Sequence, residues 1–342
     1  MTGSCVAFGE LMLRLDPADG VRLVQASSFE ARFTGAEANV AASLTQFGIP
    51  AQVVSTVPDD ALGDAALAFL RRFGVDTTPV RRRPGRLGLL YVEPGGAGRP
   101  GQVIYDRAGS VFALTGAGAY DWKALLAGHD WLHVSGTAAA VGPGAAAALD
   151  QALTAARAAG VIVSLDPNYR SRLWTTEQAG QALRPLMDRV DVLLGAGEEA
   201  ITILGLPAPR GWSPGRALST DQRVALLEQA RDHLGLRVAA GTGRSTLADG
   251  TTALCGLVAT ADGTAVSRSF PVTDERGRVG TGDSFAAGVI RGLLLGHPTQ
   301  DVAEFAAAAA YLKQSVTGDI NIASVREVED ARSGRGTDRL RR

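Results

Sequence analysis

The sequence predicts an α/β protein with a doubly wound, mostly parallel central sheet flanked by helices, and with a small antiparallel β lid. From residue 131 on, short and nearly continuous apolar strands alternate with helical stretches, which is typical of a buried parallel sheet. Two other segments alternate apolar and polar residues, as in an antiparallel sheet with one face in water. The length of 342 residues suits one large domain with an insertion.

The N-terminal part predicts a central strand followed by the first half of the lid. Residues 5–9 form a short apolar run that ends in glycine, as expected of a buried strand. Residues 11–16 and 21–24 alternate around a turn sequence with Asp, Pro and Gly, which indicates a hairpin. The chain then returns to the core with two helices and an intervening strand, at residues 38–47, 61–73 and 52–57.

A second excursion completes the lid before the parallel sheet continues. Residues 87–93 and 102–107 alternate again and predict two further lid strands. Beyond them, strands are expected at 131–135, 161–166, 190–194 and 237–240, separated by helices at 145–159, 177–189 and 222–234. Parallel sheets bind ligands at the carboxyl ends of their strands, so the functional site is expected at that edge.

These patterns divide the chain into a core, a lid and a tail. The core comprises residues 1–10, 35–85 and 108–332. The lid comprises residues 11–34 and 86–107. Residues 333–342 are rich in Arg and Gly with few apolar residues, so we expect a disordered tail.

Composition limits the classes of partner. The 34 basic and 35 acidic residues leave a net charge of −1, which gives no reason to expect nucleic acid or a membrane surface as a partner. Cys5 and Cys255 each lie in an apolar run and are expected to be buried thiols in a reducing cytoplasm. The start of the chain lacks a signal-peptide pattern, and no charge-free stretch reaches membrane-spanning length.

The sequence Gly280-Thr281-Gly282-Asp283 carries the chemistry. Behind it, apolar residues recur at helical spacing, so it is a glycine turn that opens a buried helix. The glycines let the backbone approach a ligand, and the first-turn amides favour an anion. A carboxylate beside such a site is placed to take a proton from a hydroxyl, which indicates phosphoryl transfer to an alcohol. The alternative is that Asp283 only caps its helix.

Two motifs resemble the ribokinase-like (PfkB) carbohydrate kinases, and the resemblance extends over most of residues 3–320. The first motif is Gly35-Ala36-Glu37-Ala38-Asn39-Val40-Ala41, and the second is Val279-Gly280-Thr281-Gly282-Asp283-Ser284-Phe285-Ala286-Ala287-Gly288. The resemblance implies the ribokinase-like fold. It also implies Asp283 as the general base and the amides of Gly280, Thr281 and Gly282 as an anion hole for the transferring phosphate.

Within this family, three segments resemble the 2-keto-3-deoxygluconate kinases. Residues 103–110 match that group's Tyr-x-Arg-x-x-Ser lid segment, residues 166–174 match its Asp-x-Asn-x-Arg-x-x-Leu-Trp segment, and residues 90–93 supply a lid tyrosine. Such enzymes use MgATP to phosphorylate the 6-hydroxyl of a keto-deoxy sugar acid. The resemblance therefore implies ATP and Mg²⁺ as cofactors and a sugar acid as substrate.

Arg107 and Arg170 are the argument for an acidic sugar, because Arg matches a carboxylate with paired donors. For each, an ordinary surface ion pair is the alternative. The other expected substrate contacts share a place near the lid or at a helix or strand end, and they are Gly35, Asn39, Tyr91, Tyr105 and Thr137. For Asn39 the alternative is a helix cap, for the tyrosines sheet packing, and for Thr137 a plain loop position.

On the nucleotide side, the resemblance implies four residues. Asp166 ends a strand and is expected to act through water, or else to cap the next turn. Glu199 falls where the family has a glutamate that orients Mg²⁺ through water, and its alternative is an exposed glutamate favoured by the helix dipole. Gly241 and Gly243 are expected either to contact phosphate or to form a plain turn.

Two rival functions stay open at this stage. One is a kinase of a neutral sugar such as fructose or ribose, or of a nucleoside. The other is a sugar-binding protein of the same fold that has lost catalysis. Ala196 and Gly277 favour it mildly, because the resemblance implies Asn and Asp at these two positions. We also expect a homo-oligomer, with a dimer as the default, because small lid sheets leave edges and apolar area exposed.

Overall fold

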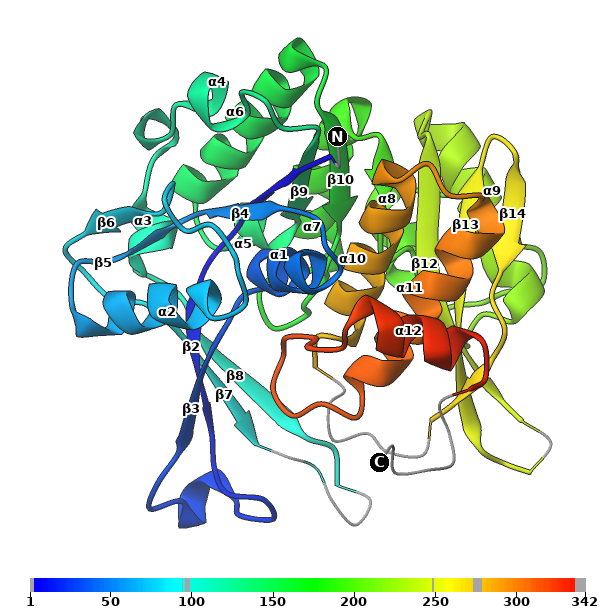
Figure 1. The fold of residues 1–342 in the computed structure, drawn as a ribbon, viewed down its shortest axis with the longest axis horizontal. Coiled ribbons are helices and arrows are strands. Elements are labelled where there is room, and N and C mark those ends of the chain that lie inside the picture. Colours follow the sequence, from blue (N-terminus) through cyan, green and yellow to red (C-terminus); the bar gives the residue numbers. More distant parts are fainter. Residues whose placement is uncertain (1–2, 94, 96–98, 248, 273–278, 336–342) are drawn as a thin grey trace.

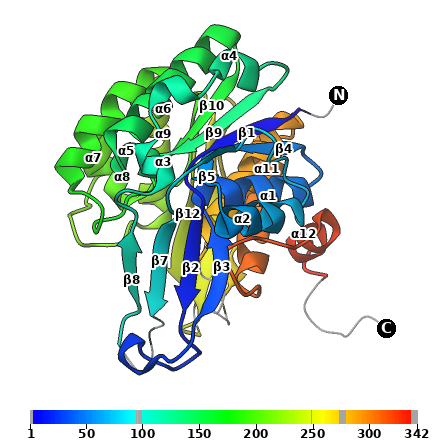
Figure 2. The ribbon, with the colours of Figure 1, turned by 90° about the vertical axis from the view of Figure 1, so that its left-hand side faces the viewer.

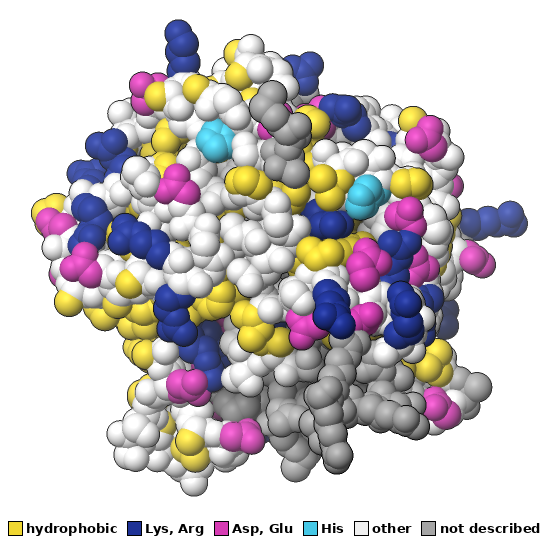
Figure 3. All heavy atoms as spheres, in the orientation of Figure 1, with side chains coloured by type: hydrophobic (Ala, Val, Ile, Leu, Met, Phe, Trp, Pro, Cys, Tyr) yellow, Lys and Arg dark blue, Asp and Glu magenta, His cyan; other side chains and the backbone are white. Residues whose placement is uncertain are grey.

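The computed structural model describes residues 3–93, 95, 99–247, 249–272 and 279–335. Figure 1 shows a twisted central sheet covered by helices, with a smaller sheet projecting from one end. In Figure 3, positive and negative side chains are interspersed over the same face, in keeping with the near-zero net charge. Within the described part, every helix is too short or too polar to span a bilayer.

Among the described residues, the central sheet has nine strands in the order β14-β13-β12-β11-β10-β9-β1-β4, with β15 pairing with β13. Six neighbouring strands are parallel, as predicted, and they are β4 (Ala51–Val54), β1 (Cys5–Phe8), β9 (Trp131–Ser135), β10 (Ile162–Asp166), β11 (Val192–Leu193) and β12 (Val238–Thr246). Three antiparallel strands extend the sheet beyond β12, and they are β13 (Thr252–Thr260), β14 (Gly263–Val266) and β15 (Phe270–Pro271).

Two helical layers cover the sheet, as Figure 2 shows edge-on. Alternate residues of β1 face opposite layers, since Cys5 and Ala7 join one apolar cluster and Val6 and Phe8 join the other. The first layer holds α1 (Ala36–Gln46), α2 (Ala61–Arg71), α10 (Thr281–Leu294), α11 (Thr299–Lys313) and α12 (Val325–Arg332). The second holds α6 (Pro143–Ala159), α7 (Thr176–Leu183), α8 (Glu198–Leu204) and α9 (Thr220–Leu234).

Shorter elements connect these layers to the sheet. A separate parallel pair consists of β5 (Thr56–Pro58) and β6 (Arg81–Arg83). The short helices around α6 and α7 are α3 (Val111–Leu114), η2 (Ala117–Ala119), α4 (Trp122–Leu125), α5 (Thr137–Ala140) and η3 (Arg184–Arg189).

The smaller sheet has the order β3-β2-β7-β8. Its strands are β2 (Met12–Asp16), β3 (Glu30–Thr34), β7 (Gly88–Glu93) and β8 (Gln102–Asp106). The two outer pairs are antiparallel, and a parallel pairing of β2 with β7 joins them in the middle. Two excursions of the chain, far apart in sequence, thus build one sheet.

Two sequence-based expectations differ from the structure, and a third is not tested by it. The strand expected at 21–24 is instead the 3-10 helix η1 (Leu23–Gln25), and β2 pairs with β3 further along. The single helix expected at 177–189 is divided into α7 and η3, because Pro185 cannot continue the α-helical hydrogen bonds. The tail expected at 333–342 lies outside the described residues, apart from residues 333–335.

Candidate active site

A cavity of about 530 Å³ lies where the inner face of the small sheet meets the carboxyl ends of the central strands. The first turn of α10 forms part of its wall through Gly280, Gly282 and Asp283. Strand β10 reaches it with Asp166, and the small sheet contributes Leu90 and Tyr105. The site therefore lies at the edge of the sheet that the parallel topology predicts.

The turn before α10 requires glycine at position 280. Gly280 has φ 82°, in the left-handed region that disfavours residues with a Cβ. A Cβ built on Gly280 would also lie 1.9 Å from the carbonyl oxygen of Asp319. The Ser284 amide donates a hydrogen bond to the Gly280 carbonyl. The amides of Gly282 and Asp283 come before Ser284, in the first turn, where N–H groups have no partner within the helix. The helix end can therefore receive an anion.

Asp283 faces this anion site with a perturbed carboxylate. Its Oδ2 accepts a hydrogen bond of 2.7 Å from Asn39 Nδ2, so the side chain contacts another pocket residue. Burial raises the pKa of Asp283 to about 7, and the carboxylates of Asp166 and Asp319 add to this rise, while Asn39 and Arg170 oppose it. A carboxylate with its pKa near neutrality is suited to accept a proton.

Asn39 has one polar atom left for a ligand. Its Nδ2 also lies 3.4 Å from Thr34 Oγ1, but its buried Oδ1 has no hydrogen-bond partner in the structure. A buried acceptor without a partner is unfavourable unless a ligand satisfies it. This geometry favours a substrate contact over the helix-cap alternative.

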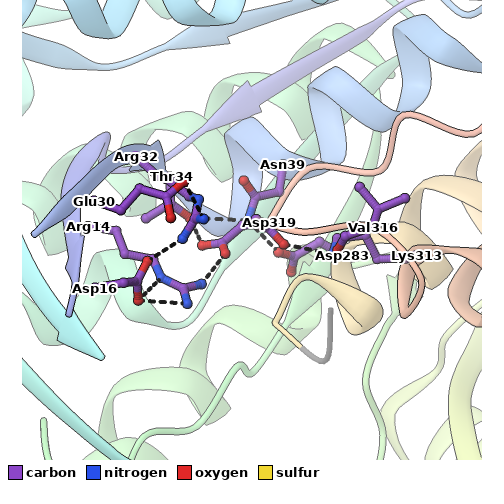
Figure 4. A network of polar contacts seen from close by, with 11 residues as sticks. Arg14, Asp16, Glu30, Arg32, Thr34, Asn39, Asp283, Lys313, Val316 and Asp319 are labelled. Atoms are coloured by element: carbon purple, nitrogen blue, oxygen red, sulfur yellow. Dashed lines mark hydrogen bonds and ion pairs between the residues drawn. The ribbon is translucent and has the colours of Figure 1, made fainter. Parts of the chain in front are cut away.

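Asp319 joins the small sheet to the first turn of α10 (Figure 4). Its carboxylate accepts hydrogen bonds from Arg14 on β2 and from Thr34 on β3, and its backbone carbonyl lies against Gly280. Arg14 and Arg32 also pair with Asp16, at 2.9 and 2.6 Å. Two strands of the small sheet are thereby tied to the residue beneath the anion site.

Glu10 holds the other side of the pocket together. Its carboxylate accepts from Arg107 Nε at 2.6 Å and from Ser110 Oγ at 2.5 Å. Both side chains of the Arg107–Glu10 pair are almost fully buried, so this is not the surface ion pair of the alternative interpretation. The bond fixes the guanidinium at Nε, and the terminal Nη groups carry the paired donors that match a carboxylate.

The structure gathers most of the predicted site residues around one cavity. Those that line it are Asn39, Tyr105, Arg107, Thr137, Asp166, Arg170, Glu199, Gly280, Gly282 and Asp283. Gly35 and Thr281 lie beside lining residues. Gly35 packs against the Glu10 carbonyl, where a Cβ would lie 2.4 Å from the oxygen, and the side chain of Thr281 is buried. Thr137 begins helix α5 and bonds to Ser135 Oγ, so it is not a plain loop position.

The prediction for Tyr91 is wrong about the face of the sheet. Leu90 pairs with Tyr105 across β7 and β8, and both line the cavity, whereas Tyr91 pairs with Ile104 on the opposite face. The Tyr91 ring instead contacts Phe29, with ring centroids 6.2 Å apart. A strand alternates its side chains, so Tyr91 and Tyr105 cannot both cover the same ligand from this register.

The glycine turn expected around Gly241 and Gly243 is also wrong, because both residues lie inside strand β12. Neither is among the residues that line the cavity. A Cβ on Gly241 would lie 2.6 Å from the Ala196 carbonyl oxygen, and one on Gly243 would lie 2.9 Å from Cys255 Sγ. Close packing within the sheet explains these glycines without a ligand, so the nucleotide contact stays a prediction.

With this geometry in place, three comparisons bear on the site. A family model described as pfkB family carbohydrate kinase matches residues 2–233. The chain belongs to that family. A 2-dehydro-3-deoxygalactonokinase of Haloferax volcanii is 32% identical over 330 residues, which cover 96% of each protein. A 2-dehydro-3-deoxygluconokinase of Bacillus subtilis is 28% identical over 326 residues, covering 94% of this chain and 93% of that protein.

Solved structures agree with the family assignment. A crystal structure of 2-dehydro-3-deoxygluconokinase from Thermotoga maritima has a TM-score of 0.89 at 37% identity, covering 98% of this chain and 99% of that chain. A putative ribokinase II from E. coli in complex with ATP and Mg²⁺ has a TM-score of 0.78 at 20% identity, which shows the shared fold. The predicted ribokinase-like fold and carbohydrate kinase family are confirmed.

In this pfkB family chain, the acidic residues at the pocket edge suit a hydrated cation. Asp166 and Glu199 line the cavity with Asp283, and burial raises the pKa of Asp166 to about 6. The Asp166 Oδ1 also accepts from the Asn168 amide at 2.8 Å, so this residue caps its turn as well. Among the described residues, no cluster of three or more His, Cys, Asp or Glu is placed to ligate a metal directly. The donors present fit Mg²⁺ reached through water.

The sequence interpretation missed several residues of the pocket. Those on the cavity wall are Glu10, Met12, Thr34, Glu37, Leu90, Val92, Val103 and Asp319. Glu10 lies two residues after the end of the first central strand, and this position at a carboxyl end was a usable signal. Asp319 follows α11 in a loop, and nothing in its local sequence indicates that it contacts strands 285 and 305 residues away.

Proposed function

We propose that this protein transfers the γ-phosphoryl group of ATP to the 6-hydroxyl of a 2-keto-3-deoxy sugar acid. The first candidate is 2-keto-3-deoxygluconate, the compound also called 2-dehydro-3-deoxygluconate. The observation that carries the proposal is that Arg107 and Arg170 line the same cavity as Asp283 and the α10 anion site. Two guanidinium groups in one cavity with a base and an anion site suit a substrate that carries both a carboxylate and a reacting hydroxyl.

The residues then take distinct parts in the reaction. The guanidinium groups hold the sugar carboxylate, Tyr105 covers the sugar from the small sheet, and Asn39 Oδ1 accepts from a hydroxyl. The 6-hydroxyl oxygen forms a bond to the γ-phosphorus as the bond from that phosphorus to the ADP oxygen breaks. Asp283 takes the hydroxyl proton late, while the amides of Gly282 and Asp283 stabilise the charge on the transferring group.

Magnesium belongs to the same proposal. When bound with the nucleotide, Mg²⁺ neutralises phosphate charge, and Asp166 and Glu199 would hold it through water. A cytoplasmic setting is also part of the proposal, and the two buried free thiols, Cys5 and Cys255, support a reducing compartment.

An ADP-release assay over an acceptor panel tests the function. The panel holds both epimers of the sugar acid, 2-keto-3-deoxygluconate and 2-keto-3-deoxygalactonate, together with fructose, ribose and a nucleoside. We expect turnover with at least one sugar acid. Arg107→Met and Arg170→Met should each raise the KM for that acid roughly 10- to 100-fold, as expected for the loss of a charge-assisted contact. Arg326→Met, at an exposed position on α12, is the matched control.

The panel also separates the rival functions. Preferred use of a neutral sugar, unaffected by the two arginine substitutions, would replace the sugar acid by a neutral acceptor. No turnover with any acceptor, in a folded protein, would favour a binding protein without catalysis.

A homo-oligomer formed through the small sheet is a further part of the proposal. The face of this sheet that points away from the cavity carries Phe29, Tyr91 and Ile104, and the Phe29 and Ile104 residues are 42% and 43% exposed. Apolar side chains gathered on an open sheet favour pairing with a second copy. Equilibrium sedimentation is expected to show a dimer that Ile104→Glu converts to monomer, and a monomeric wild type would contradict this.

A further inference from the structure

Lys313, the last residue of α11, is buried completely yet lies outside the catalytic steps described above. It is unusual in composition as well as in position. The chain has 34 Lys and Arg residues, and Lys123 and Lys313 are its two lysines. Lys123 is exposed on α4. Most basic residues of this chain are arginines, but position 313 has a lysine. The Lys313 side chain is also inaccessible to water.

The Lys313 ammonium holds the loop that follows α11. Its Nζ donates to the carbonyl oxygens of Val316 at 3.0 Å and Gly318 at 2.7 Å. The next residue, Asp319, packs its own carbonyl against Gly280 at the start of α10. The ammonium is thus linked to the backbone of the anion site by two contacts, one with Gly318 and one between Asp319 and Gly280. A shift of this loop would move the surface on which the first turn of α10 rests.

The charge of Lys313 is also close to the catalytic carboxylate. Figure 4 shows Lys313 beside Asp283, on the side away from Arg14 and Arg32. Burial lowers the pKa of Lys313 to about 8, while Asp319 and Asp283 oppose this fall. The ammonium therefore stays mainly protonated at neutral pH, and a fixed positive charge lies behind the anion site.

We propose that Lys313 is a positioning residue for phosphoryl transfer, which fixes the 316–319 loop under the first turn of α10 and balances the negative charge of the transferring phosphate from behind. This inference rests on the proposed kinase function. The geometry also explains why position 313 has a lysine and not an arginine. An ammonium is a compact group whose donors point in three directions, so it can bridge two carbonyls in a small space. A planar guanidinium is larger and prefers planar, bidentate partners.

Kinetics of Lys313→Met, with Lys123→Met as the matched control, form the first test. We expect kcat of Lys313→Met to fall roughly 100-fold, as for small misplacements of reacting groups, with both KM values within about threefold of wild type. The Lys123→Met variant should match wild type. In Lys313→Ala, ethylammonium should raise kcat above its value in equal tetramethylammonium, because only the former can donate hydrogen bonds to the carbonyls. A Lys313→Met variant with wild-type kcat would overturn the proposal.

A second measurement is made on the wild type, with Lys123→Met used only for assignment, and so does not depend on the folding of the Lys313 variants. Labelling with lysine that carries ¹⁵N at Nζ gives two ammonium signals, and Lys123→Met assigns them. We expect the Lys313 signal to be protected from exchange with water, and to shift when ADP and aluminium fluoride mimic the transferring phosphate. The Lys123 signal should stay in place. A Lys313 signal that does not respond, in protein that binds ADP, would overturn the proposal.

These outcomes are separable from failure of the proposed function. A wild type with no turnover on any acceptor refutes the kinase function itself. An active wild type whose Lys313 variants keep full kcat refutes only the role of Lys313.

Discussion

Gly280→Ala tests whether the backbone at the start of α10 makes the site. Gly280 has φ 82°, and holding an alanine in this left-handed conformation costs about 1–2 kcal/mol. The new Cβ would start 1.9 Å from the Asp319 carbonyl oxygen, whereas ordinary contacts begin at 3.4 Å, so the two segments must separate by about 1.5 Å. Overpacking of this kind costs about 1–3 kcal/mol more.

Gly296→Ala is the matched control for this substitution. Gly296 follows the same helix with φ 68°, but a Cβ there would meet no atom within 4 Å. It should therefore carry only the conformational cost, about 1–2 kcal/mol. Urea unfolding should then give Gly280→Ala the larger loss of unfolding free energy, by about 1–3 kcal/mol.

Activity should separate the two variants more clearly than stability. A displacement of about an ångström in the groups that hold the phosphate is enough to lower kcat roughly 100-fold. We expect that fall for Gly280→Ala in the ADP-release assay, and an unchanged kcat for Gly296→Ala. If both variants lost equal stability and kept full turnover, the reasoning about the Gly280–Asp319 contact would be refuted.

The remaining predictions concern charge and the small sheet. Asp283→Asn should lower kcat roughly 100- to 10,000-fold with the sugar KM preserved, and a fully active variant would exclude Asp283 as the base. In wild type, kcat/KM should rise with pH to a plateau above about 7, because the raised pKa of Asp283 keeps its carboxylate protonated below that value. Asp166→Asn should move this rise to lower pH, since the Asp166 carboxylate raises the pKa of Asp283; an unmoved profile would contradict that coupling. Tyr105→Ala should raise the sugar KM and Tyr91→Ala should not, as steady-state kinetics would show; equal effects would contradict the assigned faces.

Much of the fold was predictable because local signals and tertiary packing agree. The central strands are short apolar runs between glycines and helices, and their parallel order follows from the alternation of strand and helix. The glycines after helices 38–47 and 61–73 have positive φ, at Gly48 and Gly74, as helix ends require. The two lid excursions were recognisable from their alternation, although the parallel pairing of β2 with β7 joins segments too distant for any local pattern.

The site was predictable where chemistry is local and unpredictable where it depends on register. Gly280 to Asp283 form one contiguous turn, so their role follows from a short motif. The prediction for Tyr91 was wrong because a shift of one residue in register decides which face of the sheet a side chain takes, and the flanking sequence is compatible with either face. The turn predicted at Gly241 and Gly243 was wrong because glycine occurs at close packing inside a strand as well as in a turn.

The position of Glu10 sets how the small sheet can move relative to the core. The chain passes between the core and the small sheet at four places, and Glu10 contacts each of them. It leads into β2, its carbonyl faces Gly35, and its carboxylate meets Gly88 and Arg107. One residue therefore contacts all four crossings, and the bonds from Arg14 and Thr34 to Asp319 attach the sheet to the core at a second place. At about 3.4 Å per residue, Tyr105 lies some 7 Å from Arg107 along β8, whereas the far end at Gln102 lies some 17 Å away. A rotation of the sheet about an axis near Glu10 would therefore move the outer tip of β8 more than twice as far as Tyr105.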